Sequence, residues 1–204
     1  MLYVTSDTHF GHRNIFGPKG FEESRAHFKS ADQMNETIIR NWNNKVTQHD
    51  TVIHAGDVAL HMTPKQVFSL LKRLNGNIEI ISGNHDDSRT MKYLLQNNYT
   101  YNRKPKFTIH DIGVRMKFNK KDYYITHYPV ALGARRGRLR NLCGHIHSNP
   151  TDAPNQLNIG IDSPEIGRRP FGEPIRFEEA VQLMNVKWQK SREKSDVDVK
   201  ESRL

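Results

Sequence analysis

Residues 78–86 read Ile-Glu-Ile-Ile-Ser-Gly-Asn-His-Asp, a short apolar run followed at once by residue types that bind metals. The run 78–81 predicts a β-strand, and Gly83 begins the polar segment behind it. In a layered α/β sheet, ligands bind outside the carboxyl ends of the strands. The stretch therefore predicts a strand that delivers Asn84, His85 and Asp86 to the functional edge of such a sheet.

Four further apolar runs, at 2–4, 52–53, 124–125 and near 142, end in the same way. The acidic and histidine residues that follow them are Asp7, His9, Asp57, His127, His145 and His147. The glycines at these strand ends are Gly56, Gly83 and Gly144. Glycine adopts a positive φ and allows close backbone approach, as a site loop requires. We therefore expect all five runs to bring their polar residues to one edge.

The chemistry of these side chains predicts a metal site. Carboxylates, an amide oxygen and imidazoles suit Mn, Fe, Zn, Co or Ni, and disfavour Cu(I) or an Fe–S cluster. Seven such ligands are too many for one tetrahedral ion, and they suit two ions about 3.5–4 Å apart that share a carboxylate. We therefore expect two divalent metal ions. Mn²⁺ is the preferred candidate, and Fe, Zn, Ni and Co are the alternatives. With only Asp7 and Asp57 as carboxylate ligands, the cluster would keep positive charge and hold an anion such as phosphate.

The ordered motifs resemble the calcineurin-like metallophosphoesterase family. They are Asp7-x-His9, Gly56-Asp57, Gly83-Asn84-His85-Asp86, His127 and Gly144-His145-x-His147. The segments 6–12 and 158–162 are similar to the short branch found in bacteria and phages. The resemblance implies an α/β (α+β) fold in which a two-sheet β-sandwich is flanked by helices, in a four-layer architecture.

The resemblance also implies a role for each motif residue. Asp7, His9 and His147 would bind one metal, and Asn84, His127 and His145 the other, with Asp57 bridging. His85 would contact the phosphate and protonate the leaving oxygen, and Asp86 would orient the His85 ring. A metal-bound hydroxide would attack phosphorus in line.

Two further groups are candidates for substrate binding. His12 follows Gly11 in the first motif loop and either faces the substrate or is a plain loop histidine. The basic segment between His127 and His145 contains Arg135, Arg136, Arg138 and Arg140. We expect the flanking motifs to hold this segment close to the metals, where arginine suits bidentate phosphate binding. The alternative is a solvated basic loop.

These features predict a phosphoesterase that favours phosphodiesters and a nucleotide-like substrate. The net charge of +9, from 31 Lys and Arg against 22 Asp and Glu, agrees either with a phosphorylated small molecule or a nucleic-acid-derived partner, or with a solvated surface that has few acidic residues. A phosphomonoesterase or a small nuclease of the same fold is the alternative. A third hypothesis is a non-catalytic scaffold. Such proteins tend to have lost a metal ligand or the histidine at the His85 position.

The rest of the sequence sets the domain plan and the compartment. Of the 204 residues, 1–188 are expected to form the phosphoesterase domain and 189–204 a polar, mobile tail after a last helix at 177–188. Residues 107–124 are expected to form a hairpin, with a turn near 111–113 between strands at 107–109 and 114–118, and a second turn at 119–122 before a strand at 123–125. No stretch approaches the ~20 apolar residues of a membrane span, and no signal peptide is evident. A lone cysteine, Cys143, suits a reducing compartment, so we expect a cytoplasmic protein. We expect it neither to bind a membrane nor to need an obligate protein partner.

Overall fold

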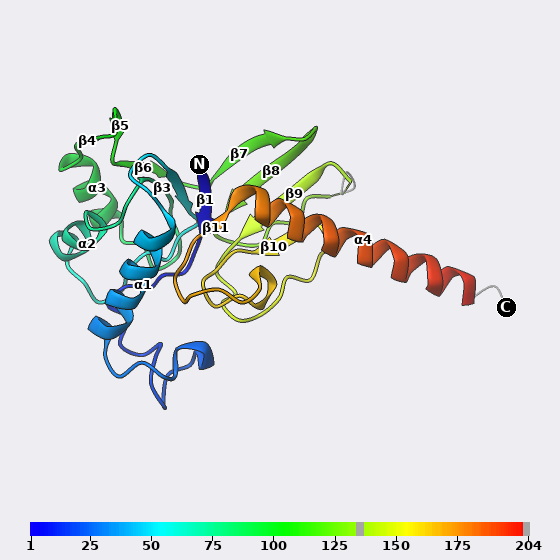
Figure 1. Ribbon diagram of the computed structural model, residues 1–204, viewed down its shortest axis with the longest axis horizontal. Helices are drawn as coiled ribbons and strands as arrows, with labels where there is room; N and C mark the ends of the chain where they lie inside the picture. Colours follow the sequence, from blue (N-terminus) through cyan, green and yellow to red (C-terminus); the bar gives the residue numbers. More distant parts are fainter. Residues whose placement is uncertain (134–136, 202–204) are drawn as a thin grey trace.

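The computed structural model describes residues 1–133 and 137–201, which fold around two main β-sheets (Figure 1). The first sheet has the order β11-β1-β2-β3-β6, with β11 antiparallel and the others parallel. Its strands are β1 (Leu2–Thr5), β2 (Thr51–His54), β3 (Asn77–Ile81), β6 (Phe107–His110) and β11 (Ile175–Arg176). The short strands β4 (Thr100–Tyr101) and β5 (Lys104–Pro105) pair separately.

The second sheet has the order β10-β9-β8-β7, in which only β7 runs antiparallel to its neighbour. Its strands are β7 (Gly113–Phe118), β8 (Lys121–Thr126), β9 (Leu139–Cys143) and β10 (Gln156–Asn158). The helices are α1 (Ala31–Lys45), α2 (Pro64–Leu71), α3 (Ser88–Gln96) and α4 (Phe177–Glu201), with 3₁₀ turns η1 (Glu23–Arg25) and η2 (Pro164–Ile166).

Side-chain caps define the starts of α1 and α2. The Ser30 side chain accepts a hydrogen bond from the Gln33 N–H at the start of α1. At α2, Thr63 and Gln66 form a reciprocal capping box in front of Pro64. Such caps satisfy backbone donors that the first helical turn leaves unpaired.

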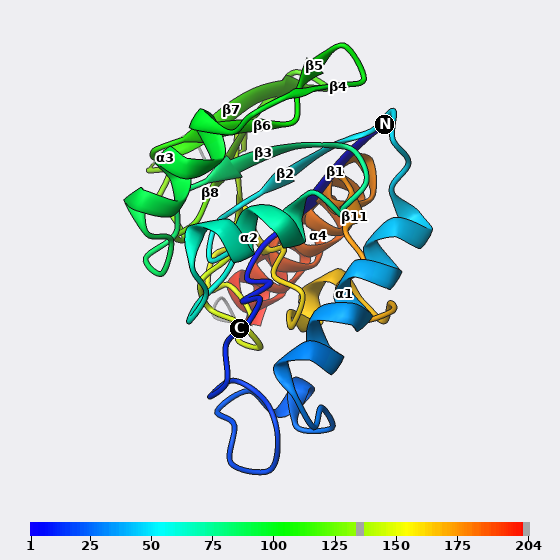
Figure 2. The ribbon, with the colours of Figure 1, turned by 90° about the vertical axis from the view of Figure 1, so that its left-hand side faces the viewer.

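Two apolar cores hold the layers together. Helices α1, α2 and α3 lie on one side of the first sheet (Figure 2). The core between these helices and the sheet includes Trp42, Leu71 and Ile78. The other fills the space between the sheets, where Ile53 of β2 and Ile125 of β8 belong to the same cluster. Helix α4 closes this second core by packing on β10 and β11. The prediction of an α/β fold with two sheets flanked by helices is confirmed.

The predicted pairing of residues 107–109 with 114–118 is wrong, whereas the predicted second turn, between 114–118 and 123–125, is confirmed, because β7 and β8 pair antiparallel across it. Strand β6 pairs in parallel with β3, whereas β7 pairs with β8, so residues 111–112 carry the chain from the first sheet to the second. Phe107 belongs to the helix-covered core, while Val114 packs against the core between the sheets. Alternating apolar residues predict a strand but do not identify its partner.

The last helix is longer than predicted. It continues beyond Trp188 to Glu201, so most of the segment expected to form a tail is helical, and its far end projects away from the sheets in Figure 1. Lys, Arg, Glu and Gln have good helix propensity, which allows the helix to continue without an apolar face. Among the helices of the described residues, none is long and apolar enough to cross a bilayer.

Candidate metal centre

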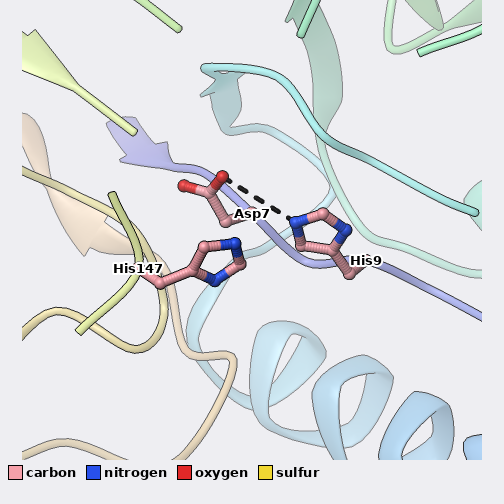
Figure 3. Close-up of side chains that lie close together, drawn as sticks. All are labelled: Asp7, His9 and His147. Carbon is pink, nitrogen blue, oxygen red and sulfur yellow. Dashed lines mark ion pairs between the residues drawn. The ribbon is translucent and has the colours of Figure 1, made fainter. Parts of the chain in front are cut away.

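The predicted ligands meet at the carboxyl ends of β1, β2, β3, β8 and β9. They form two groups, within each of which the potential ligand atoms lie within 4.8 Å of one another. The groups are Asp7, His9 and His147, and Asp57, His127 and His145. Figure 3 shows the first group, in which the Asp7 carboxylate and the two imidazole rings face a common space.

Asp57 lies between the two groups. Its Oδ2 is 3.5 Å from His9 Nε2 and also 3.5 Å from His127 Nε2. The seventh predicted ligand, Asn84, joins the second group, because its Oδ1 lies 2.9 Å from His127 Nε2. Asp57 is therefore the carboxylate that faces both groups.

The donor atoms of the first group fit a divalent cation. Both ring nitrogens of His9 are buried without a hydrogen-bond partner among the described residues, which is costly for polar atoms. Burial, together with the Arg25 guanidinium, holds the pKa of His9 far below its usual value, so the ring is neutral and has a free lone pair. Burial also raises the pKa of Asp7 to about 6. A cation bound here would satisfy both side chains.

The backbone at the ligands is strained. A left-handed conformation, with φ between 47° and 72°, occurs at Asp7, His9, Asp57, His145 and His147. Outside glycine this conformation costs about 1–2 kcal/mol per residue. Hydrogen bonds between the loops hold it in place, with the Asp7 N–H donating to Gly56 O and the His9 N–H to Asp57 O, both at 3.0 Å. Strain of this kind is typical of functional sites.

Two of the predicted glycines are required by close approach. A Cβ at Gly144 would lie 1.9 Å from Ser6 Oγ and 2.5 Å from Asp7 Oδ2. A Cβ at Gly83 would lie 2.3 Å from Asp57 Oδ1. Any side chain at these positions would displace a ligand carboxylate or the chain beside it.

Asp86 does not have the predicted geometry. Its carboxylate accepts backbone N–H bonds from Gly83, Asp57 and Val58 at 2.8–2.9 Å. These bonds fix the loops that carry Asp57 and Asn84, whereas the predicted partner was the His85 ring. Asp86 is therefore a positioning residue for the ligand loops.

His85 and His12 both lie beside the first group. The His85 ring is 5.5 Å from the His9 ring and 6.3 Å from the His12 ring, measured between centroids, and His85 is exposed. His12 is 6% exposed, and burial lowers its pKa to about 4. His85 is thus at the mouth of the site, and His12 lies deeper. A substrate contact for His12 stays a prediction.

The sequence reasoning missed Arg25 and its partner. Arg25 is fully buried, pairs with the Asp162 carboxylate and donates to Asp7 O at 2.6 Å. Asp162 Oδ2 in turn lies 3.2 Å from His147 Nδ1. Although burial opposes ionisation, Arg25 and His147 hold the pKa of Asp162 below its usual range. Asp162 stands in the segment 158–162 that carried the resemblance, but Arg25 lies in a polar loop without any recognisable pattern.

Arg138 and Arg140 do not lie beside the metal centre as predicted. Because β8 and β9 are parallel, the chain between them returns to the opposite edge of the sheet. At that edge, Arg138 O accepts a hydrogen bond from the Asp122 N–H at 3.0 Å. Cys143, at the metal edge, lies five residues further along the chain, which is about 16 Å of extended strand. Arg140 is buried, with its guanidinium 4.4 Å from the Trp188 ring centroid. Arg135 and Arg136 lie outside the described residues.

Comparisons with known proteins agree with this geometry. The model of the family described as calcineurin-like phosphoesterase matches residues 1–197. An uncharacterized protein of Methanocaldococcus jannaschii is 42% identical over 86 residues, and the match spans 42% of this chain and 46% of that relative.

Solved structures resemble the chain at lower identity. The crystal structure of a protein of unknown function from Aquifex aeolicus aligns with a TM-score of 0.64 at 22% identity, over 90% of this chain and 98% of that one, which shows a shared fold. A structure described as a novel archaeal phosphodiesterase aligns with a TM-score of 0.39 at 23% identity, over 79% of this chain and 83% of that one. The latter similarity is too low to support an argument.

Proposed function

The chain belongs to the calcineurin-like phosphoesterase family, a family of metal-dependent hydrolases, and on that premise we propose that it hydrolyses phosphodiesters at a dinuclear metal centre. The observation that supports two metals is the position of Asp57 Oδ2, at 3.5 Å from a histidine of each ligand group. Asp7, His9 and His147 would hold one ion, and Asn84, His127 and His145 the other. The nitrogen and oxygen donors suit Mn²⁺ and its neighbours in the first transition row.

Metal ions and the chain's own residues would have different roles in the reaction. When bound, divalent ions held by these residues would activate water and neutralise charge on the phosphoryl oxygens. The His85 side chain would donate the proton that the leaving oxygen takes up. The main-chain N–H of His85 donates to Asp57 Oδ1 at 2.9 Å, which fixes this imidazole beside the ligands.

A diester is favoured over a monoester by the charges near the ligands. The buried arginine beside Asp7 is Arg25, and Asp162 already neutralises it. Arg25 therefore adds no positive charge for the second ionised oxygen of a phosphomonoester. A phosphodiester carries a single negative charge, so it has no second ionised oxygen that needs a positive partner.

The test is a hydrolysis screen of protein reconstituted with Mn²⁺, Fe²⁺, Zn²⁺, Co²⁺ or Ni²⁺. Matched nitrophenyl mono- and diesters, cyclic nucleotides and short oligonucleotides serve as substrates. We expect metal-dependent hydrolysis, faster on diesters than on monoesters. A fully metal-loaded protein that cleaves none of these compounds would support a scaffold instead.

The Asp162→Asn variant is expected to bind metal more weakly. Removing a carboxylate that orients a ligand histidine typically costs about 10–100-fold in metal affinity. Calorimetric titration with Mn²⁺ measures this change, after circular dichroism has confirmed folding. Asp152→Asn, which changes an exposed carboxylate ten residues earlier, is the control. Equal affinity in Asp162→Asn and the wild type would exclude the orienting role.

The Arg138→Ala variant is expected to keep wild-type kinetics on nucleotide and oligonucleotide substrates. Arg138 is exposed and lies at the sheet edge opposite the ligands. KM values measured at low salt, where exposed charges act over the longest distance, give the most sensitive comparison. A rise in KM that disappears as salt is added would show that this arginine reaches the substrate after all.

A further inference from the structure

A hollow of about 200 Å³ opens beside the second ligand group. Its walls come from the end of β3, from the crossing between β6 and β7, and from the segment after β8. Ser82, Ile112, His127, Tyr128 and Val130 all line it. Since His127 is one of the predicted metal ligands, the hollow adjoins the predicted metal centre. Its volume is below the roughly 300–1,000 Å³ of pockets for drug-sized ligands, so it suits one small group.

The surface of the hollow is apolar and exposed. Ile112 is 84% exposed, Tyr128 51% and Val130 37%, and the three are neighbours around one opening. The Tyr128 ring lies 5.0 Å from the His127 ring and 4.6 Å from the His145 ring, between centroids. Exposed apolar side chains that cluster in a concave site mark a place where a ligand binds. Here the cluster includes an aromatic face beside two metal ligands.

Hydrogen bonds hold the Tyr128 segment in position. The Thr126 hydroxyl donates to Tyr128 O at 2.6 Å, and the buried Asn141 amide donates to Thr126 Oγ1 at 2.9 Å. The same Asn141 accepts the Val130 N–H at 2.9 Å. Pro129 adds a fixed φ between the two ends. Because this backbone is already fixed, little main-chain freedom is lost when a ligand stacks on the Tyr128 ring.

The charge of the hollow excludes a second phosphate. Asp111 lines it, and no lysine or arginine is among its described lining residues. A carboxylate repels an anion but accepts hydrogen bonds from an amino or imino group. A nucleobase is a neutral planar ring with hydrogen-bond donors at its edge. It therefore avoids repulsion by the Asp111 carboxylate and can donate a hydrogen bond to it.

Building on the proposed function, we propose that this hollow binds the base of the nucleoside that stays on the phosphorus, stacked on Tyr128. His85, which serves the leaving oxygen, lies on the His9 side of the centre. Tyr128 lies on the His145 side. The leaving group therefore departs past His85, and the retained nucleoside occupies the hollow. The substrate is a diester with a nucleoside on its retained side.

Two substrates with the same leaving group test this assignment. The nitrophenyl ester of thymidine monophosphate carries a base on the retained side, and nitrophenyl methyl phosphate does not. We expect wild-type kcat/KM to favour the thymidine ester. Tyr128→Ala should reduce this preference by about 5–150-fold, because base–aromatic stacking contributes about 1–3 kcal/mol. Tyr128→Phe, which keeps the ring, should retain it.

Leu95→Ala is the matched control, since Leu95 is 51% exposed and lies on α3. It should leave kcat/KM on both esters unchanged. If Tyr128→Ala lowers kcat/KM equally on the two esters, Tyr128 is only structural and the proposal is overturned. An absence of preference in the wild type overturns it as well.

A binding titration separates this proposal from the proposed function. Calorimetry on the metal-loaded protein compares thymidine monophosphate with inorganic phosphate, so no turnover is needed. If the wild type cleaves neither ester, the proposed function fails. Tighter binding of the nucleotide that is lost in Tyr128→Ala still supports the hollow as a base site. Equal binding of the two anions by the wild type contradicts it.

Discussion

Asp57→Ala should lose both metal ions, or retain one weakly, and with them the hydrolysis of diesters. The variant removes the carboxylate oxygen that lies 3.5 Å from His9 Nε2 and 3.5 Å from His127 Nε2. It also removes the acceptor of the His85 N–H, so the neighbouring loop is released. Elemental analysis of the reconstituted variant, beside a hydrolysis assay, measures both effects.

The Asn variant separates charge from shape at the same position. Asp57→Asn keeps an acceptor oxygen for the His85 N–H but removes the negative charge between the two ligand groups. We expect its metal content to fall almost as far as in Asp57→Ala. Asp152→Ala removes an exposed carboxylate and should retain full metal content. Two tightly held ions in Asp57→Ala would rule out bridging by this residue.

His85→Ala should lower kcat by about 10²–10⁴-fold, the usual contribution of general acid–base catalysis, while metal content stays near normal. The metal is expected to stay because the bond from residue 85 to Asp57 uses the main-chain N–H, which alanine keeps. The loss of kcat should be smaller for nitrophenyl esters, since a leaving group of low pKa needs little protonation. His49→Ala, an exposed histidine outside the ligand groups, is the control.

Two outcomes would contradict the role given to His85. A large loss of metal would place His85 among the ligands or their supports. An equal loss of kcat on good and poor leaving groups would show that the imidazole does not protonate the leaving oxygen.

The ligand positions could be predicted from the sequence because they follow from local pattern and strand direction. A short apolar run that is followed by Asp57 or by Asn84 forms a strand and places that residue at the carboxyl edge of the sheet. This placement depends on the local sequence alone. Parallel pairing of β1, β2 and β3 then brings these edges together. The same reasoning predicted the glycines that permit close approach.

The remaining features depend on contacts that spacing does not encode. Arg25 and Asp162 are 137 residues apart, and neither position indicates the other. Asp86 follows His85 in sequence, yet its oxygens bind the backbone of two loops.

The prediction for Arg138 and Arg140 was wrong for a geometric reason. Ligand motifs on both sides suggested that the segment stays near the metals. A connection between parallel strands must instead run back to the other edge before the second strand begins, which carries Arg138 away from the site. With Arg138 and Arg140 placed away from the site, the preference for a nucleotide-like substrate rests on the hollow beside Tyr128.

The most direct test of the dinuclear centre is the metal content of the wild-type protein after reconstitution with Mn²⁺. Elemental analysis should give about two equivalents per chain, and the electron paramagnetic resonance spectrum should show two ions coupled through a shared bridge. A single tightly bound equivalent with the spectrum of an isolated ion would contradict the account.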